Sequence, residues 1–273
     1  QKRFFWTLHD RSPLTGGNHV TSDYDYSKYE KLLQKNISKK VNYIKGCNLK
    51  VIGPSTWISN IAKASEVFKS FDVFCIPNCL DTEVFKPKDK TVEREELQLP
   101  PDKKVMLFVA EDPKAQYKGM HLLLQSLAQI KNPKGICLLI IGKKFEVNSV
   151  NFEMKQLGVI NSEETLAKIY NAADFLLIPS LDDNLPNTMV ESLSCGTPVL
   201  AFKIGGIPDM VIPNETGLLA PRGDVTALTA NIEYFVSLPD TSSYSVNARK
   251  LAEARCSEAV VVKQLVRLYE NKG

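Results

Sequence analysis

The chain has 273 residues, of which 44% are hydrophobic and 8% aromatic, as expected for one large or two ordinary globular domains. Its 34 basic and 31 acidic residues leave a formal net charge of +3, and no block of five like charges occurs, so the charge pattern does not indicate nucleic-acid binding. No apolar run reaches the roughly 18 residues of a membrane span, which excludes a membrane-spanning segment.

The chain begins at Gln1 with neither an initiator methionine nor the regions of a signal peptide, so we expect it to be part of a longer protein. Its cysteines are scattered and several lie in apolar runs, so we expect reduced thiols in a cytoplasmic protein. Cys75 and Cys79 are four residues apart, but no second pair of ligands lies near them, and a zinc site is not predicted.

The first part of the chain predicts a small α/β unit. Its apolar runs indicate three strands, over residues 3–10, 48–55 and 72–78. Residues 55–70 have the apolar spacing of a helix between the last two strands.

Residues 80–104 are charged and carry prolines near both ends, which is typical of a linker. We therefore divide the chain into a partial N-terminal domain of residues 1–86 and a C-terminal domain of residues 87–273. The tail over residues 245–270 has helical spacing and predicts one long packing helix, which could return to the first domain.

The second part of the chain predicts a parallel sheet. Apolar runs recur about every 30 residues, at 104–110, 135–142, 174–179, 197–202 and 216–220. Segments with helical spacing lie between them, at 119–130, 162–173 and 187–196. This alternation predicts βαβ units, and the continuous apolar strands indicate a Rossmann-like sheet covered on both faces.

A polar insertion over residues 182–202 follows one of these strands. In open parallel sheets, ligands bind where the strands end and loops enter helices. Asp183 and Asn184 are good helix caps, and a helix starting at Asn187 would offer free N–H groups to an anion. Glu191, one turn inside, can accept two hydrogen bonds from a ribose diol. The insertion predicts half of a nucleotide-sugar site, or alternatively an ordinary βα loop.

The spacing from Asp183 to Glu191, followed by residues 194–221, resembles the acid-x7-Glu signature of retaining glycosyltransferases of family 4 (glycosyltransferase group 1), of the bacterial polysaccharide-biosynthesis type. Five further segments match in order: HDRSPLTGG, GPSTWIS, IPNCLDTEVFKP, YKGMHLLLQSL and LGVINSEETLAKIYNAADFLLIPS. The resemblance runs from His9 to about Tyr269. It implies the α/β GT-B fold, with a Rossmann-like donor domain preceded by a partial Rossmann-like acceptor domain.

The resemblance assigns roles to the residues of the signature. Glu191 would bind the donor ribose, and Asp183, which is shorter than the usual glutamate, would lie beside the hydroxyls of the donor sugar. Asn184 and the two residues after it replace a glycine-rich turn, and Asn184 would contact the donor. The amides of Asn187 and Thr188 would face the diphosphate.

Lys118, in the segment YKGM, would neutralise the leaving diphosphate as the glycosidic bond breaks. Many members carry an arginine a few residues earlier. None is present here, and Lys114 is the nearest substitute. The alternative is that Lys118 is a solvated loop residue.

His9 resembles the strand-end histidine of the family that approaches the donor sugar, although a local bond to Asp10 is the ordinary alternative. Gly16 and Gly17 could let the backbone approach the donor, or form a plain turn. Related enzymes often have cysteines in the next region, where this chain has Asn18, so no metal is expected.

Other motifs carry little weight. The Asp-x-Asp motif at residues 23–25 lies in a polar stretch rather than at the end of a buried strand, so we discount it as a metal site. His19 and His121 have no supporting context. The dinucleotide fingerprint of dehydrogenases and the P-loop are absent.

We therefore expect a retaining, hexosyltransferase-type glycosyltransferase that uses a UDP or GDP sugar without a metal or other cofactor. The expected acceptor is a glycan or a lipid-linked molecule, the latter with peripheral membrane contact. The alternatives are a nucleotide-sugar-binding fragment without transfer activity, because a divided acceptor pocket cannot position a nucleophile, and a GT-B-fold epimerase or phosphorylase, for which we find no signature.

Overall fold

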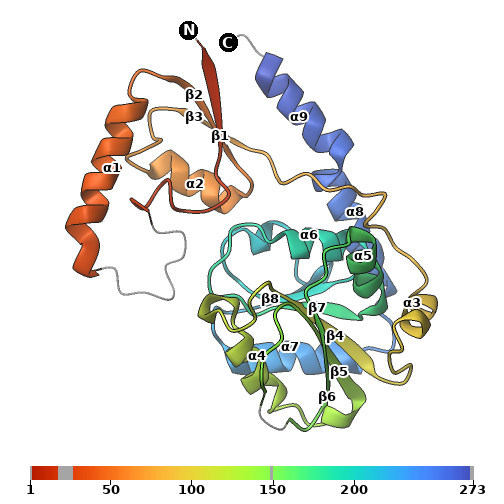
Figure 1. Ribbon diagram of the computed structural model, residues 1–273. Helices are drawn as coiled ribbons and strands as arrows, with labels where there is room; N and C mark the ends of the chain where they lie inside the picture. Colours follow the sequence, from red (N-terminus) through yellow and green to blue (C-terminus); the bar gives the residue numbers. More distant parts are fainter. Residues whose placement is uncertain (1, 18–26, 148–149, 271–273) are drawn as a thin grey trace.

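The computed structural model describes residues 2–17, 27–147 and 150–270, which form two α/β units, each built on a parallel sheet (Figure 1). Asn18, His19 and the Asp-x-Asp motif at 23–25 lie outside the described residues. Among the residues that the structure describes, no helix combines the length and the apolar character needed to cross a membrane.

The first unit contains the three predicted strands, β1 (Arg3–Thr7), β2 (Asn48–Gly53) and β3 (Asp72–Cys75), paired in that order. Two helices accompany them, α1 (Glu30–Ile44) and α2 (Thr56–Ala64). The helix predicted over residues 55–70 ends early because Ser65 adopts an extended conformation. Ser55 caps its start by accepting a hydrogen bond from the Ile58 amide, and its apolar face is buried against the sheet.

The second unit has a six-stranded sheet in the order β6-β5-β4-β7-β8-β9, with all neighbours parallel. The strands are β4 (Lys104–Val109), β5 (Ile136–Ile141), β6 (Glu153–Gly158), β7 (Phe175–Ile178), β8 (Val199–Phe202) and β9 (Gly217–Ala220). Every residue of β5, β7 and β8 is buried. This confirms the expectation of continuous apolar strands covered on both faces.

Helices cover this sheet on two sides: α3 (Lys90–Glu96), α4 (Met120–Leu127), α5 (Glu163–Ala172), α6 (Asn187–Ser194) and α7 (Val225–Ser237). α4 packs against α7, whereas α6 packs against α5 and α8 (Ser242–Cys256). Figure 1 places these two groups on opposite sides of the sheet. The carboxyl ends of the strands are left open toward the first unit.

Three elements of the second unit were not predicted, among them α7, which follows β9. β6 is a polar strand at the edge of the sheet, where half-buried side chains provide no apolar signal. α3 lies within the predicted linker; Asp89 caps it, and Arg94 anchors it to Asp174 through a 2.6 Å ion pair. The predicted domain boundary between residues 86 and 87 falls just before α3 and remains a prediction.

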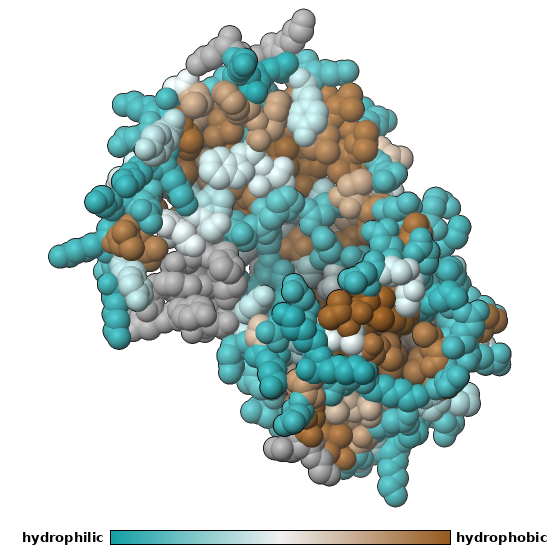
Figure 2. All heavy atoms as spheres, in the orientation of Figure 1, coloured by the Kyte–Doolittle hydropathy of each residue, from teal (hydrophilic) through white to brown (hydrophobic). Residues whose placement is uncertain are grey.

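The C-terminal tail is two helices rather than the one predicted. α8 ends at Cys256, and α9 (Glu258–Glu270) follows after Ser257, which is extended and pairs with Leu80. α9 packs on the first unit, where Val261 and Leu268 share an apolar cluster with strand residues. Figure 1 shows α9 beside the first sheet, and Figure 2 shows apolar side chains gathered in this part of the surface.

Several polar bonds join the two units. Asn184, in the loop before α6, donates hydrogen bonds to the carbonyls of Leu8 and His9 and accepts one from the Ser55 hydroxyl. The Thr56 amide at the start of α2 donates to the Asp209 carboxylate across the junction. A Cβ atom at Gly206 would lie 2.3 Å from the Ser55 Cβ, so the close approach of the units requires glycine there.

Candidate functional site

Six of the ten predicted site residues line two pockets at the carboxyl ends of the second unit's strands. The first pocket, of about 190 Å³, lies in the cleft between the units. It is lined by His9, Asp10, Arg11, Trp57, Tyr117, Lys118, Asp182, Asp183 and Asn184. We call it the cleft pocket.

The second pocket, of about 440 Å³, belongs to the second unit alone. Its lining mixes aliphatic and polar side chains, from the ends of β4 and β5, the segment after β6 and α5, and Thr188 and Glu191 of α6 complete it. We call it the α6 pocket. The chain from Asp183 to Glu191 runs from one pocket to the other, so one loop and one helix start serve both.

Lys118 and Asp183 form an ion pair in the cleft pocket, with 2.9 Å between the Lys118 Nζ and the Asp183 Oδ2. Both side chains are partly buried. Gly119 fixes the position of the lysine: its φ is +73°, and a Cβ there would lie 1.8 Å from the Pro179 carbonyl oxygen. Only glycine allows this turn to pack on the end of β7. Lys118 is therefore a positioned cation rather than a freely solvated loop residue.

The structure places the amide group of Asn184 at the junction described above, where the side chain is buried. Its donor contact remains a prediction that these bonds do not support. The prediction that Asp183 and Asn184 cap α6 is wrong. Pro186 occupies the N-cap position of α6, and its carbonyl accepts from the Met189 amide.

The start of α6 faces both units. Asn187 and Thr188 are its first two residues, and amides at these positions have no partner within a helix. The side-chain oxygen of Asn187 accepts a hydrogen bond of 2.8 Å from Asn78, which joins the helix start to the segment after β3. Thr188 lines the α6 pocket. These amides are suitable donors for an anion between the two pockets.

Glu191 lies in the α6 pocket and accepts a 2.7 Å hydrogen bond from the Tyr170 hydroxyl. Burial raises the pKa of Glu191, and this hydrogen bond opposes the rise in part. The buried phenol has its own pKa raised by burial and by the neighbouring carboxylate, so it stays protonated and donates. Because each carboxylate oxygen can accept two hydrogen bonds, Glu191 retains capacity for a ligand diol.

We expect Tyr170→Phe to weaken ligand binding in the α6 pocket by about 0.5 to 1.5 kcal/mol, because Glu191 would lose the donor that fixes its orientation. The ring would still fill the core, so the fold should persist. Calorimetric titration with nucleoside diphosphates measures the effect, and thermal unfolding serves as the control. An unchanged dissociation constant in a folded variant would show that the Tyr170 hydroxyl does not support the ligand.

Three predicted site residues, Lys114, Gly16 and Gly17, line neither pocket. Lys114 is exposed and does not line either pocket, although its amide bonds to the Asp112 carboxylate. Gly16 has a φ of +76°, and a Cβ there would lie 2.4 Å from the Leu33 carbonyl oxygen, so close packing on α1 already explains it. Gly17 has a φ of +138° and open space around it. A donor contact for these three residues remains a prediction.

His9 lines the cleft pocket, as its predicted role requires. The ordinary alternative, a local bond between His9 and Asp10, is not the arrangement found. The Asp10 carboxylate instead accepts hydrogen bonds from the amide and the hydroxyl of Ser12.

Arg11 and Trp57 are pocket residues that the sequence did not identify. The Arg11 guanidinium lies 5.6 Å from the centre of the Trp57 ring, and its Nη1 is 3.8 Å from the Asp182 Oδ2. Arg11 follows His9 within a matched motif, but the sequence gives no sign of its contact with Asp182. Arg11 and Asp182 are 171 positions apart and belong to different units.

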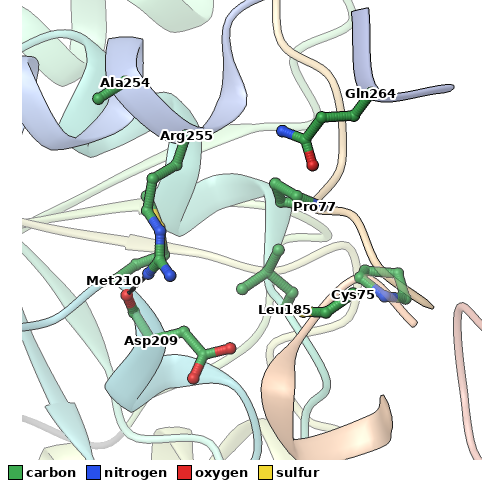
Figure 3. Close-up of a pocket in the computed structure, with 9 residues that line it drawn as sticks. Cys75, Pro77, Leu185, Asp209, Met210, Ala254, Arg255 and Gln264 are labelled. Atoms are coloured by element: carbon green, nitrogen blue, oxygen red, sulfur yellow. Dashed lines mark hydrogen bonds between the residues drawn. The ribbon is translucent and has the colours of Figure 1, made fainter. Parts of the chain in front are cut away.

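A third pocket, of about 250 Å³, lies between the first unit and the C-terminal helices (Figure 3). In Figure 3, Leu185 projects between Pro77 and Asp209. The polar groups here bind one another across the junction: Arg255 donates to the Asp209 carbonyl, and the Asp209 carboxylate accepts from Thr56. This pocket is part of the packing between the units, and we do not assign it to the nucleotide.

Comparison with known proteins gives consistent matches. The profile of the family "Glycosyl transferases group 1" matches residues 89–251. The chain is 30% identical over 178 residues to a D-inositol 3-phosphate glycosyltransferase of Segniliparus rotundus, covering 60% of this chain and 39% of that protein. The chain thus spans about two fifths of the length of this relative.

Two solved structures illustrate the fold. A sucrose-phosphate synthase from Thermosynechococcus elongatus superposes with a TM-score of 0.80 and 25% identity, covering 97% of this chain and 66% of that one. Anabaena HepE in complex with UDP-glucose superposes with a TM-score of 0.78 and 20% identity, covering 98% of this chain and 72% of that one. Both are GT-B proteins, and this confirms the predicted fold class.

Proposed function

The chain belongs to the family of group 1 glycosyl transferases, and from this premise we propose that it binds a nucleotide-diphosphate sugar and moves the sugar to a glycan or lipid-linked acceptor with retention. The observation that carries the proposal is the meeting of Lys118, Asp183 and His9 in one cleft pocket beside the pocket that holds Glu191. Family membership alone does not identify which side chains act, and this geometry supports the choice of these four.

The α6 pocket suits a nucleoside. Its aliphatic side chains, such as Val109 and Ile141, offer an apolar surface for a base, and polar side chains such as Asn161 can bind the edge of the base. Glu191 lies at the α6 side of this pocket, where it can accept from the two ribose hydroxyls. A UDP or GDP donor is our expectation, and the UDP-glucose bound to HepE supports the choice of UDP as the first probe.

The cleft pocket suits the diphosphate and the sugar. The nucleoside in the α6 pocket would direct its phosphates past Thr188 and the first amides of α6 toward Lys118. Before the donor binds, Lys118 is paired with Asp183. In the proposed complex Lys118 turns to the diphosphate, which leaves the Asp183 carboxylate free to accept hydrogen bonds from the sugar hydroxyls.

We propose a front-face displacement for the transfer. The bond between the anomeric carbon and the diphosphate oxygen breaks, the acceptor hydroxyl oxygen bonds to the same face of that carbon, and its proton passes to the departing diphosphate. Negative charge grows on the diphosphate during this step. Lys118 and the α6 amides stabilise that charge more in the transition state than in the bound donor, which is how they would raise the rate.

A second candidate function is binding without transfer. It is favoured by the location of the predicted donor residues, since Lys118, Asp183 and Glu191 all belong to the second unit. The second unit can thus bind a donor without a complete acceptor pocket.

Two measurements on this 273-residue chain test these functions. Calorimetry with UDP, GDP and ADP should show saturable binding of one of them, with uridine, guanosine and adenosine as controls for the contribution of the phosphates. Incubation of the matching nucleotide sugar with a panel of glycans and lipid-linked glycans, followed by mass spectrometry of the product, tests transfer. Failure of all three nucleotides to bind would contradict both functions, and binding without product would favour the second.

A further inference from the structure

Two adjacent acids of the cleft pocket hold two cations from opposite sides. Asp183 pairs with Lys118 of the second unit at 2.9 Å, and Asp182 lies 3.8 Å from Arg11 of the first unit. All four side chains line the same pocket. The cleft thus has one cation on each wall, with two neighbouring carboxylates between them.

The two ion pairs differ in strength. The Lys118–Asp183 distance is that of a charge-assisted hydrogen bond, whereas 3.8 Å between Arg11 and Asp182 is too long for one. The Arg11 guanidinium also lies over the Trp57 ring, 5.6 Å from its centre, and this aromatic contact helps to orient the cation. The aromatic ring therefore orients a cation that can exchange its carboxylate neighbour for a better acceptor.

The neighbouring carboxylates indicate what that acceptor is. Two adjacent anionic groups, each near one cation, match the charge pattern of a diphosphate, which also has two adjacent anionic groups. Guanidinium groups bind phosphate oxygens in a planar, two-bond geometry that a carboxylate 3.8 Å away does not satisfy.

We propose that Arg11 binds the diphosphate of the donor, so that the diphosphate is held across the cleft between Arg11 of the first unit and Lys118 of the second. The inference rests on the proposed function, because it requires the donor to occupy this site. In the proposed function the first unit contacts only the sugar of the donor. Arg11 would add a contact from this unit to the diphosphate. Donor binding would then link the two units directly.

The affinities of UDP, UMP and uridine test this proposal in the wild-type chain and in Arg11→Met; the guanosine series replaces them if GDP is the nucleotide that binds. We expect Arg11→Met to weaken UDP binding about tenfold and UMP binding less than threefold, and to leave uridine unchanged, because the lost contact is to the diphosphate. Arg11→Lys should retain part of the UDP affinity. Arg267→Met, at an exposed position of α9, is the matched control.

Asp182→Asn separates phosphate binding from a structural role. If Arg11 serves the diphosphate, removing its carboxylate neighbour should strengthen UDP binding by about two- to fivefold, because a competitor and a repulsive charge are lost. If the Arg11–Asp182 pair only holds the cleft together, the same substitution should weaken all three ligands.

Three results would overturn the proposal: unchanged UDP affinity in Arg11→Met, equal losses for UDP, UMP and uridine, or weaker UDP binding in Asp182→Asn. A wild-type chain that binds none of the nucleoside diphosphates would overturn the proposed function itself. The two failures are therefore distinguishable.

Discussion

Replacing Lys118 with alanine should slow cleavage of the donor about 100- to 1,000-fold while weakening binding of the intact donor less than tenfold. The reason is the stage of the reaction at which negative charge develops on the diphosphate. The diphosphate gains negative charge as the bond to the sugar breaks, so a cation beside it contributes most in the transition state. In the resting chain part of the lysine's charge is already satisfied by Asp183, which further limits its contribution to ground-state binding.

The measurement is release of nucleoside diphosphate from the nucleotide sugar, whether the sugar passes to an acceptor or to water, since both break the same bond. Lys134→Ala, at an exposed position outside both pockets, is the matched control. Equal losses in rate and affinity would show that Lys118 acts only in ground-state binding. If Lys118→Ala had full activity and Lys114→Ala were slow, the cation of the site would be Lys114.

Glu191→Gln should weaken nucleotide binding by about 1 to 3 kcal/mol, or roughly 5- to 150-fold. A carboxylate shared by two ribose hydroxyls accepts from both, whereas an amide offers one acceptor and turns a donor toward the other hydroxyl. Glutamine is a good helix former, so α6 should be retained. Calorimetry with the nucleoside diphosphate measures the loss, and Glu215→Gln, at an exposed position, is the control.

We also expect nucleotide affinity to depend on pH in the wild-type chain and not, in the same way, in Glu191→Gln. Burial raises the pKa of Glu191 above that of an exposed glutamate, so protonation begins at a higher pH than usual. Because ribose binding needs the ionised form, affinity should fall as the pH is lowered toward this raised pKa. The glutamine variant cannot titrate there and should show no such fall. A wild-type affinity with the same pH profile as Glu191→Gln would remove the carboxylate from the ribose site.

The sequence predicted those parts of the fold that rest on local patterns. β5 and β7 were predicted because all their residues are apolar and buried. β6 was missed because its side chains are polar and half-buried at a sheet edge, where pairing with β5 decides the conformation. The break at Ser257 was missed for a similar reason: it depends on pairing with Leu80, 177 residues earlier, and leaves the helical periodicity on either side intact.

The same distinction applies to the site. Lys118, Asp183 and Glu191 were predicted as site residues from short motifs that resemble those of the family, and their roles stay predictions. Tyr170 and Arg11 were not predicted, because their contacts with Glu191 and Asp182 exist only in the folded chain. The donor contact of Asn184 stays a prediction, whereas its amide bonds to the first unit could not be predicted from the motif.

The packing of α9 on the first sheet has a consequence for how the chain folds as it is synthesised. Ile52 and Ile76 are buried partly by Val261 and Leu268, and the Phe5 ring stacks edge-on against Tyr269 at 4.5 Å. The packing of β1 is therefore complete only after synthesis of a helix that lies more than 250 residues later in the chain. Contacts of such sequence separation form slowly, and the apolar face of the first sheet stays available to chaperones until the ribosome has released α9.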